Sequence, residues 1–279
     1  MLSRQNGTGV EASVPFYFYP MLVFLAESKT MSSEQLPLAS SEYENHMPLL
    51  EKMADAIMSN ISHLSPPEIS EKMGISGQLG VKTLNLAYDF ANKTIGYLAL
   101  EGFTGEAYKG LEAFTMTKEG KDNAAKDLRI ISSAYGYLRP SDIIKPYRLE
   151  YNKEICPDDM TPIKYFKPKV TVEIVKEIKE ANIKDIIDLL PADADAMLDW
   201  KIIRAFAKVH KICFKVMKSD GSLKTPIAKR LKELRGKMSR FIFENGIDSF
   251  NQLISTESPD FIYSPLDSKP GLPVFISTE

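Results

Sequence analysis

Cysteine, histidine and tryptophan are scarce in this chain of 279 residues, which has two cysteines, three histidines and one tryptophan. Cys156 and Cys213 lie far apart and form no C-x-x-C pair, so neither a disulfide framework nor a thiolate zinc site is indicated. His46, His63 and His210 have no partner at metal-ligand spacing, which argues against a zinc enzyme. We therefore expect no metal and no cofactor, and a reducing cytoplasm fits the cysteine usage.

Long apolar runs are also missing, since nowhere do 18 apolar residues follow one another, and a membrane span is not expected. The most apolar stretch, residues 13–26, could pass for the core of a signal peptide. Pro15 and Pro20 interrupt it, however, and Arg4 is the only positive charge before it. We interpret residues 1–20 as a disordered lead segment or one added for expression, followed by a buried strand at 21–25.

Ordinary globular composition accompanies these absences, with 44% hydrophobic and 26% charged residues. A helical apolar stripe covers residues 44–61. Ser65 and Glu68 form a capping box with proline between them, which predicts a helix beginning at Pro66. Gly74 and Gly77 interrupt the pattern, and Ser76 can cap a second helix that runs to about residue 90. The sequence thus predicts helix, tight hairpin and helix over about 65–90.

The next segments predict a strand at 94–100, a glycine-rich turn at 102–110 and a helix at 118–127 capped by Thr117, followed by a strand at 128–132. Glycines after a strand can present backbone amides to a phosphate, or they can simply supply a turn. No Walker motif completes this turn, because Leu111 follows its last glycine. Further along, a helix is expected at 170–181 and a strand at 184–190.

Residues 129–150 combine cationic side chains with tyrosines. Such a mixture can grip phosphates and stack on bases or sugars. Asp142 and Glu150 could instead pair with the cations internally, and residue types alone leave both interpretations open. The residues concerned are Arg129, Tyr135, Tyr137, Arg139, Lys145, Tyr147 and Arg148.

The formal net charge of −2 hides a strongly basic segment at 201–240, which contains thirteen Lys and Arg residues and only two acidic residues. Within it, residues 208–218 alternate and precede the turn 219–221, which favours a hairpin, although lysines at intervals of three and four also fit a helix. A well-marked helix follows between Thr225 and Gly246, with Ile227 and Leu231 among its expected inward residues. Its outer face is either a polyanion site or an ordinary solvated surface; that face carries Lys229, Lys232, Arg235, Ser239 and Arg240.

The chain from Met21 onward resembles the YaaA peroxide-stress protein family. The resemblance rests on the order and spacing of six motifs: Lys29-Thr30, Phe103-Thr104-Gly105-x-x-Tyr108-x-Gly110-Leu111, Leu128-Arg129-Ile130-x-Ser132, Tyr135-Gly136-x-Leu138-Arg139-Pro140-x-Asp142, Pro146-Tyr147-Arg148-Leu149-Glu150 and Arg235-Gly236-x-Met238-Ser239-Arg240-Phe241-Ile242-x-Glu244-Asn245.

The resemblance implies one α+β domain over 21–279, with a mixed sheet flanked by helices, a helix-hairpin-helix element and a basic cleft. It also implies a protein linked to hydrogen peroxide resistance, limited free iron and DNA binding, with no established reaction. The expected partner is DNA, bound by shape and not by sequence, with a monomer favoured. The expected DNA-binding residues are Lys29, Lys72, Gly74, Ser76, Gly77, Lys82, Tyr108, Arg129, Tyr135, Arg139, Tyr147, Arg148, Arg235, Ser239 and Arg240.

Two departures from the family pattern stand out. Ala26-Glu27-Ser28 replaces Ser-Pro-Ala before Lys29 and puts a carboxylate beside the expected phosphate site. Asp188 to Ala194 matches the family's Asn-Leu-Ala-Ser-x-Glu-Tyr stretch only loosely. An alternative function is an enzyme acting on a nucleotide, a base or damaged nucleic acid, with Asp142 and Glu150 as acid/base groups. Direct iron binding is a third hypothesis, for which the few histidines and cysteines are poor ligands.

Overall fold

The computed structural model describes residues 21–32, 46–92 and 96–278. The expected lead at 1–20 therefore lies outside the described residues. Strand β1 (Met21–Ala26) forms where the sequence predicts it and is buried throughout. Burial on both faces explains why its sequence is a continuous apolar run and not an alternating one.

A five-stranded sheet has the order β4-β3-β1-β6-β7 and places β1 at its centre. Strands β3 (Leu128–Ser132) and β6 (Asp185–Asp188) pair with β1 in parallel, and β7 (Lys208–Lys211) pairs with β6 in parallel. Strand β4 (Gly136–Leu138) returns antiparallel beside β3. The sheet is mixed, as expected, and all four parallel strands end at one edge.

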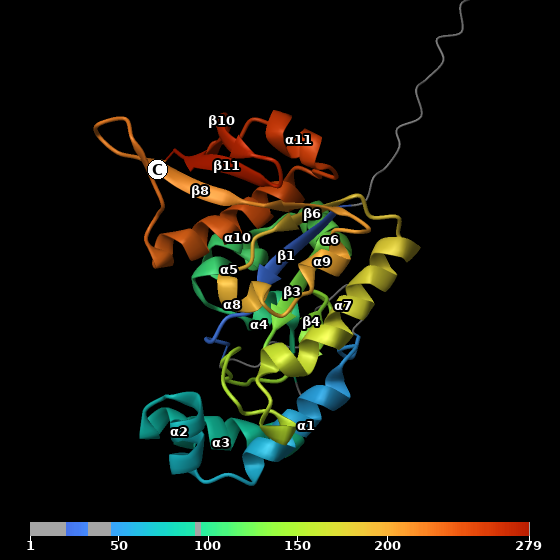
Figure 1. Cartoon of the computed structure of the whole chain (residues 1–279), viewed down its shortest axis with the longest axis vertical. Coiled ribbons are helices and arrows are strands. Elements are labelled where there is room, and N and C mark those ends of the chain that lie inside the picture. Colours follow the sequence, from blue (N-terminus) through green and yellow to red (C-terminus); the bar gives the residue numbers. More distant parts are fainter. Residues whose placement is uncertain (1–20, 33–45, 93–95, 279) are drawn as a thin grey trace, which may run out of the picture.

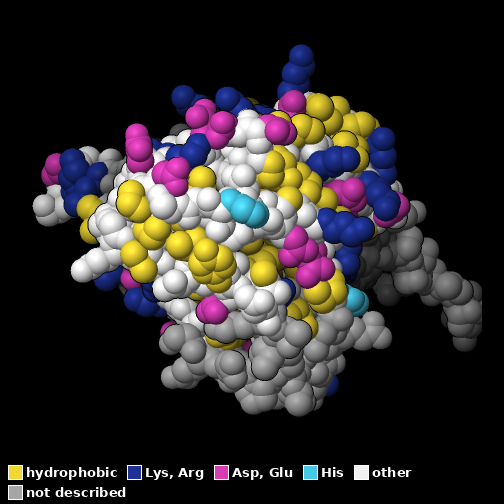
Figure 2. Space-filling model, turned by 90° about the horizontal axis from the view of Figure 1, so that it is seen from below, with side chains coloured by type: hydrophobic (Ala, Val, Ile, Leu, Met, Phe, Trp, Pro, Cys, Tyr) yellow, Lys and Arg dark blue, Asp and Glu magenta, His cyan; other side chains and the backbone are white. Residues whose placement is uncertain are grey.

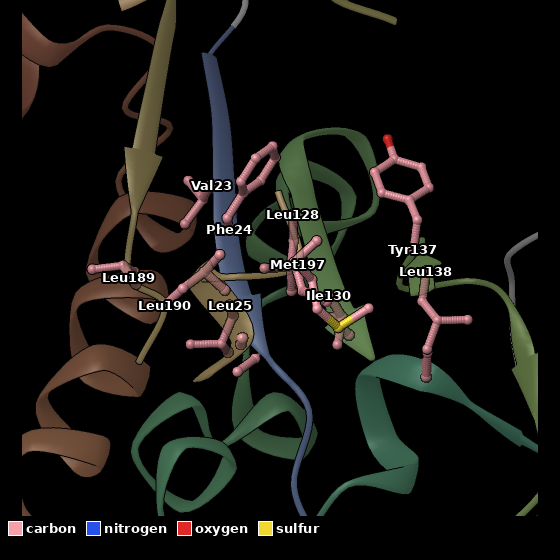
Figure 3. Packing of buried hydrophobic residues seen from close by; sticks show 14 of the residues in the cluster. Val23, Phe24, Leu25, Leu128, Ile130, Tyr137, Leu138, Leu189, Leu190 and Met197 are labelled. Atoms are coloured by element: carbon pink, nitrogen blue, oxygen red, sulfur yellow. The ribbon is translucent and has the colours of Figure 1, made fainter. Parts of the chain in front are cut away.

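Helices cover both faces of this sheet (Figure 1). On one face lie α7 (Pro162–Glu180) and α9 (Trp200–Ile203), and the Trp200 ring stands 6.1 Å from that of Phe24. The other face is covered by α5 (Glu106–Leu111), α6 (Lys118–Asp127) and α10 (Ala228–Glu244). The core between the layers is apolar; Figure 3 shows side chains of β1, β3 and the segment after β6 packed together.

A second sheet has the order β10-β11-β8-β9. Its strands are β8 (Cys213–Met217), β9 (Leu223–Lys224), β10 (Phe261–Lys269) and β11 (Leu272–Ser277), and α11 (Phe250–Ser255) precedes β10. The hairpin predicted around 219–221 is confirmed, because β8 and β9 pair antiparallel and Gly221 has φ +81°. Residues 208–218 are not one strand, however: β7 belongs to the first sheet and β8 to the second.

The helix predictions at 66–90 are confirmed in outline. Helix α1 (Glu51–Ser62) is followed by α2 (Pro66–Met73), whose capping box by Ser65 and Glu68 is present. Gly74 ends α2 in the left-handed region, and α3 (Gly77–Asn92) follows. The three helices lie at one end of the molecule, away from the second sheet (Figure 1). Two helices joined by a tight turn are therefore present, while their DNA-binding role stays a prediction.

Several local predictions were wrong. Of the strand expected at 94–100, residues 94 and 95 lie outside the described residues. From residue 96 onward only β2 (Tyr97–Leu98) is strand, pairing with β5 (Ile143–Ile144), and the chain then turns into the short helix α4 (Ala99–Gly102). The expected glycine-rich turn at 102–110 is largely helix α5. Ile227, expected to point inward, is 76% exposed because α10 begins one residue later and only its subsequent turns pack.

Other predictions hold with different bounds. Helix α6 begins after its predicted cap, since the Thr117 hydroxyl accepts the Gly120 amide at 3.0 Å. Helix α7 begins at Pro162, eight residues before the predicted start, and contains Pro168 in its first turns. A short helix, α8 (Ala192–Asp195), lies between β6 and α9.

Candidate functional site: a cavity at the carboxyl edge of the sheet

The chain passes from β1 to β3 on one side of β1 and later to β6 on the other, so the direction of winding reverses between β1 and β6. In sheets of parallel strands, ligands bind in the crevice outside the carboxyl ends of the strands at such a reversal. A cavity of about 530 Å³ lies at this place. Residues 25–30, at and just after the end of β1, line it together with Leu189, Pro191 and Asp193 after β6. Helices α5 and α10, with Thr104 and Tyr151, form the remaining walls.

The Glu27 carboxyl is the most unusual group in this cavity. It accepts hydrogen bonds from the Ser133 amide at 3.0 Å and from the hydroxyls of Ser133 and Tyr147. Burial raises its pKa to about 7, even though these hydrogen bonds favour the charged form. A carboxyl with a pKa near neutrality can both give and take a proton under physiological conditions.

Tyrosines surround this carboxyl. The Tyr108 hydroxyl donates to the Ala26 carbonyl at 3.2 Å, and the Tyr151 hydroxyl donates to the Ile131 carbonyl at 2.9 Å. Burial and the nearby Glu27 raise the pKa values of Tyr108, Tyr147 and Tyr151 well above the ordinary tyrosine value. These phenols therefore stay protonated and hold the strand ends together.

Cationic side chains stand on the cavity walls. Lys29 pairs with Glu150, one of the two predicted acid/base residues. Lys109 pairs with Glu106 at 2.9 Å. Arg235 of α10 also lines the cavity, and none of the hydrogen bonds among the described residues involves its guanidinium. Burial lowers the pKa of Arg235, while Asp188 and Asp193 oppose that effect.

Of the predicted DNA-binding arginines and lysines, only Lys29 and Arg235 line this cavity. Arg129 is buried on the α7 face, where its Nε donates to the Tyr137 hydroxyl at 2.9 Å and to Glu177 at 3.0 Å. Arg240 binds the 111–115 loop, donating to the Glu112 carbonyl at 2.8 Å. The described residues thus do not bring the predicted arginines and lysines together in this one cavity.

The remaining predicted residues fall into two groups. Tyr108, Tyr135, Tyr147 and Ser239 are buried; the Tyr135 hydroxyl accepts the Lys145 amide at 2.9 Å, and the Ser239 hydroxyl donates to the Arg235 carbonyl at 3.0 Å. Their side chains are committed to internal contacts, so direct contact with DNA would require rearrangement. The residues of the second group are exposed or half-buried; they are Arg139, Arg148, Lys72, Gly74, Ser76, Gly77 and Lys82.

Asp142, the second predicted acid/base residue, is buried away from the cavity. It accepts the Arg139 amide at 2.8 Å and so stabilises the turn after β4. Burial raises its pKa to about 6. Sequence reasoning missed Glu27, treating it only as a disturbance beside Lys29. The available signal was its position, directly after a buried strand, where catalytic and binding side chains of such sheets are found.

The family assignment follows from comparison with known proteins. The family model described as peroxide stress protein YaaA matches residues 21–266. This chain belongs to that family.

Its relatives carry names without an activity. A UPF0246 protein of Shewanella halifaxensis is 30% identical over 265 residues, covering 92% of this chain and 98% of its own. One from Teredinibacter turnerae is 30% identical over 260 residues, covering 91% and 98%, respectively. One from Francisella philomiragia is 28% identical over 248 residues, covering 88% and 95%. Each alignment thus spans nearly the whole length of both sequences.

None of the helices within the described ranges combines the length and apolar character that crossing a membrane requires.

Proposed function

We propose that this member of the peroxide stress family binds DNA by its backbone, without reading sequence, and that the hairpin of α2, the 74–76 turn and α3 makes the contact. The observation that carries the proposal is the exposed amino end of α3 at Gly77. Helix amino ends offer unsatisfied amides and a partial positive charge, which suit a phosphate group.

The hairpin has the local geometry for such a contact. The Leu79 amide bonds to the Ser76 hydroxyl at 3.4 Å and the Gly80 amide to the Ser76 carbonyl at 2.9 Å, while no hydrogen bond among the described residues uses the Gly77 or Gln78 amide. A Cβ on Gly77 would have no atom within 4 Å, so solvent or a ligand has direct access to this backbone.

Positive charge near the hairpin comes from a few lysines. Lys82 is exposed on α3, Lys72 pairs with Asp159 at 2.8 Å, and the Lys153 ammonium approaches Gly74. Figure 2, which looks onto this end of the molecule, shows Lys and Arg interspersed with Asp and Glu. A shape-directed contact with a few phosphates fits this mixture better than a broad electrostatic surface.

Gly77→Asp tests the proposal with little risk to the fold. The added side chain has free space, and an acidic residue in the first turn favours the helix. It would, however, place a carboxylate where the phosphate binds. We expect duplex DNA affinity to fall roughly tenfold or more, since removing one charge-assisted contact costs about 1.5–3 kcal/mol.

Gly77→Asn is the matched control, with the same shape and no charge. It should retain most of the affinity, and wild-type binding should weaken with increasing salt because bound phosphates release counterions. DNA affinity is measured by fluorescence anisotropy. Equal affinities of wild type and Gly77→Asp would show that the hairpin does not contact DNA.

The proposal places the protein in the cytoplasm as a monomer and makes any effect on free iron indirect, since three histidines and two cysteines give few ligands for the metal. Calorimetric titration with ferrous iron should then give no stoichiometric binding. Sedimentation analysis at micromolar concentration should give the mass of one chain.

A second candidate function is an enzyme that acts on a nucleotide, a base or damaged nucleic acid. The specific observation in its favour is Glu27, whose pKa of about 7 suits proton transfer at the edge of a cavity. Incubation with nucleotides and damaged oligonucleotides, followed by mass spectrometry, should reveal a product that Glu27→Gln does not form. No new species in the wild-type reactions would exclude this candidate for those substrates.

A further inference from the structure

Arg235 presents an unusual electrostatic situation. Its side chain is half-buried, yet no described residue accepts a hydrogen bond from its guanidinium. Asp188 and Asp193 are near enough to influence its charge. Asp188, however, accepts bonds from Lys211 and from the Leu190 amide, both at 2.8 Å, and Asp193 accepts the Ala194 amide at 3.0 Å. A guanidinium has five donors, and those of Arg235 remain available to a ligand because the half-buried side chain still reaches solvent.

The cavity in front of Arg235 has the size and lining of a small-molecule site. Its volume of about 530 Å³ is far larger than an inorganic ion needs and falls within the range of roughly 300–1,000 Å³ typical of ligand pockets. Leu25, Ala107 and Leu189 provide apolar wall, and Ser28, Thr30 and Thr104 contribute polar residues. A bound molecule would therefore meet a cation at one side and an apolar surface beside it.

We propose that this cavity binds a small organic oxyanion of about mononucleotide size, a phosphate ester or a carboxylate, with Arg235 as its anchor and Lys232 as a second cation. The planar guanidinium can bind two oxygens of such a group side by side. The organic part lies against Leu25 and Leu189, within reach of the Glu27 carboxyl at the end of β1. This binding is separate from the DNA contact of the hairpin and requires no reaction.

The charges around the cavity favour this ligand. Lys29 and Lys109 are already paired with Glu150 and Glu106. Lys232 is exposed on α10, and no ion pair within the described part of the chain includes it. Arg235 and Lys232 are therefore the cations that can bind an incoming anion, with Glu106 as the acidic neighbour of Lys232. Asp193 lines the same space and acts on Arg235, so an incoming oxyanion must compete with this carboxylate for the guanidinium.

Isothermal titration calorimetry on the full chain, with three probes, tests the inference. Adenosine 5′-monophosphate and ribose 5-phosphate represent phosphate esters, and citrate represents carboxylates. At least one should bind saturably at one site per chain, and inorganic phosphate and adenosine should bind at least tenfold more weakly. Arg235→Gln should weaken binding roughly 10- to 100-fold, the loss expected for a charge-assisted hydrogen-bond pair.

Two further variants show whether a loss of binding comes from the lost charge or from a damaged fold. Lys232→Gln changes an exposed helical position and should weaken binding by a factor of about two to ten, as expected for a partly screened charge. Arg204→Gln is the matched control; Arg204 lies over the Trp200 ring, 5.6 Å from its centroid, and does not line the cavity. It should leave probe affinity unchanged.

The preferred probe identifies the chemistry: stronger binding of the two esters indicates a phosphate ligand, and stronger binding of citrate indicates a carboxylate. The inference is overturned if none of the three probes binds the wild type, or if Arg235→Gln binds as tightly. Gly77→Asp should retain full probe affinity. Failure of DNA binding and failure of cavity binding are therefore separate results.

Discussion

Gly110 of α5 and Gly236 of α10 bring the backbones of these two helices into direct contact. A Cβ on Gly236 would overlap the Ala107 carbonyl and lie 2.7 Å from the Leu111 amide, and a Cβ on Gly110 would overlap the Glu233 carbonyl. Each glycine thus accommodates the backbone of the other helix. Arg235 directly precedes Gly236, and it lines the cavity together with Ala107 and Lys109 of α5.

Gly236→Ala should destabilise the protein, because neither helix backbone can move away without disturbing the core. We expect a loss of about 1–3 kcal/mol or more in unfolding free energy, as for other overpacked sites. Urea denaturation followed by circular dichroism measures it. Gly77→Ala is the control, since its Cβ meets open space, and it should be neutral or slightly stabilising. Equal stability of the two variants would contradict the close contact.

Arg129→Ala should reduce stability and not DNA affinity. Its guanidinium is buried and bound to Glu177 and Tyr137, and removing one partner of a buried ion pair costs about 3–5 kcal/mol. Arg139 is exposed, so Arg139→Ala should change stability by no more than about 0.5 kcal/mol. A stable Arg129→Ala variant that no longer binds DNA would instead show that Arg129 contacts the nucleic acid.

Stability should fall as the pH rises from about 4 to 7. Burial raises the pKa values of Glu27 to about 7 and of Asp127 and Asp188 to about 6. In this window the folded protein holds more protons than the unfolded chain, so unfolding becomes easier as the protons leave. Glu27 alone accounts for at most roughly 3–4 kcal/mol. Unfolding free energies at several pH values should therefore decline less steeply for Glu27→Gln than for wild type; a parallel decline would show that Glu27 does not titrate there.

Cys156 should resist modification despite the association of the family with peroxide. Burial leaves its side chain 1% exposed and raises its pKa to about 12, so the reactive thiolate is scarce at neutral pH. Cys213 is half-buried and should react first with iodoacetamide or hydrogen peroxide. Peptide mapping by mass spectrometry, with a urea-unfolded control in which both thiols react, compares the two. Modification of native Cys156 at the rate of Cys213 would contradict this prediction.

Local chemistry made much of the fold predictable. The capping residues Ser65 and Thr117 and the αL glycine at 74 act within a few residues of themselves, and each marks a helix boundary that the structure contains. The apolar run at 21–25 likewise identified a buried strand. At 96–100 the same reasoning failed, because β2 pairs with the distant β5 over two residues and the chain that follows forms a helix.

The candidate site depends on contacts that no local pattern contains. Arg129 and Arg235 look alike in the sequence. In the structure Arg129 is buried and bound to Glu177 of α7, whereas Arg235 lines a cavity. The family resemblance implied a shared basic cleft, whereas the position of each residue on its strand or helix separates them. Glu27 became a candidate only once α5, α10 and the strand ends were seen to meet, and the same view placed Lys232, known before only as part of a basic helix face, at this cavity.

The central position of β1 also has a consequence for synthesis of the chain. Its partners β3 and β6 follow about 100 and 160 residues later, so β1 leaves the ribosome long before it can pair. At roughly 5–20 residues per second, the delay before β6 exists is on the order of 10–30 s. During that time Met21-Leu22-Val23-Phe24-Leu25 is an exposed apolar segment, and a nascent chain of this protein is a natural client for a chaperone.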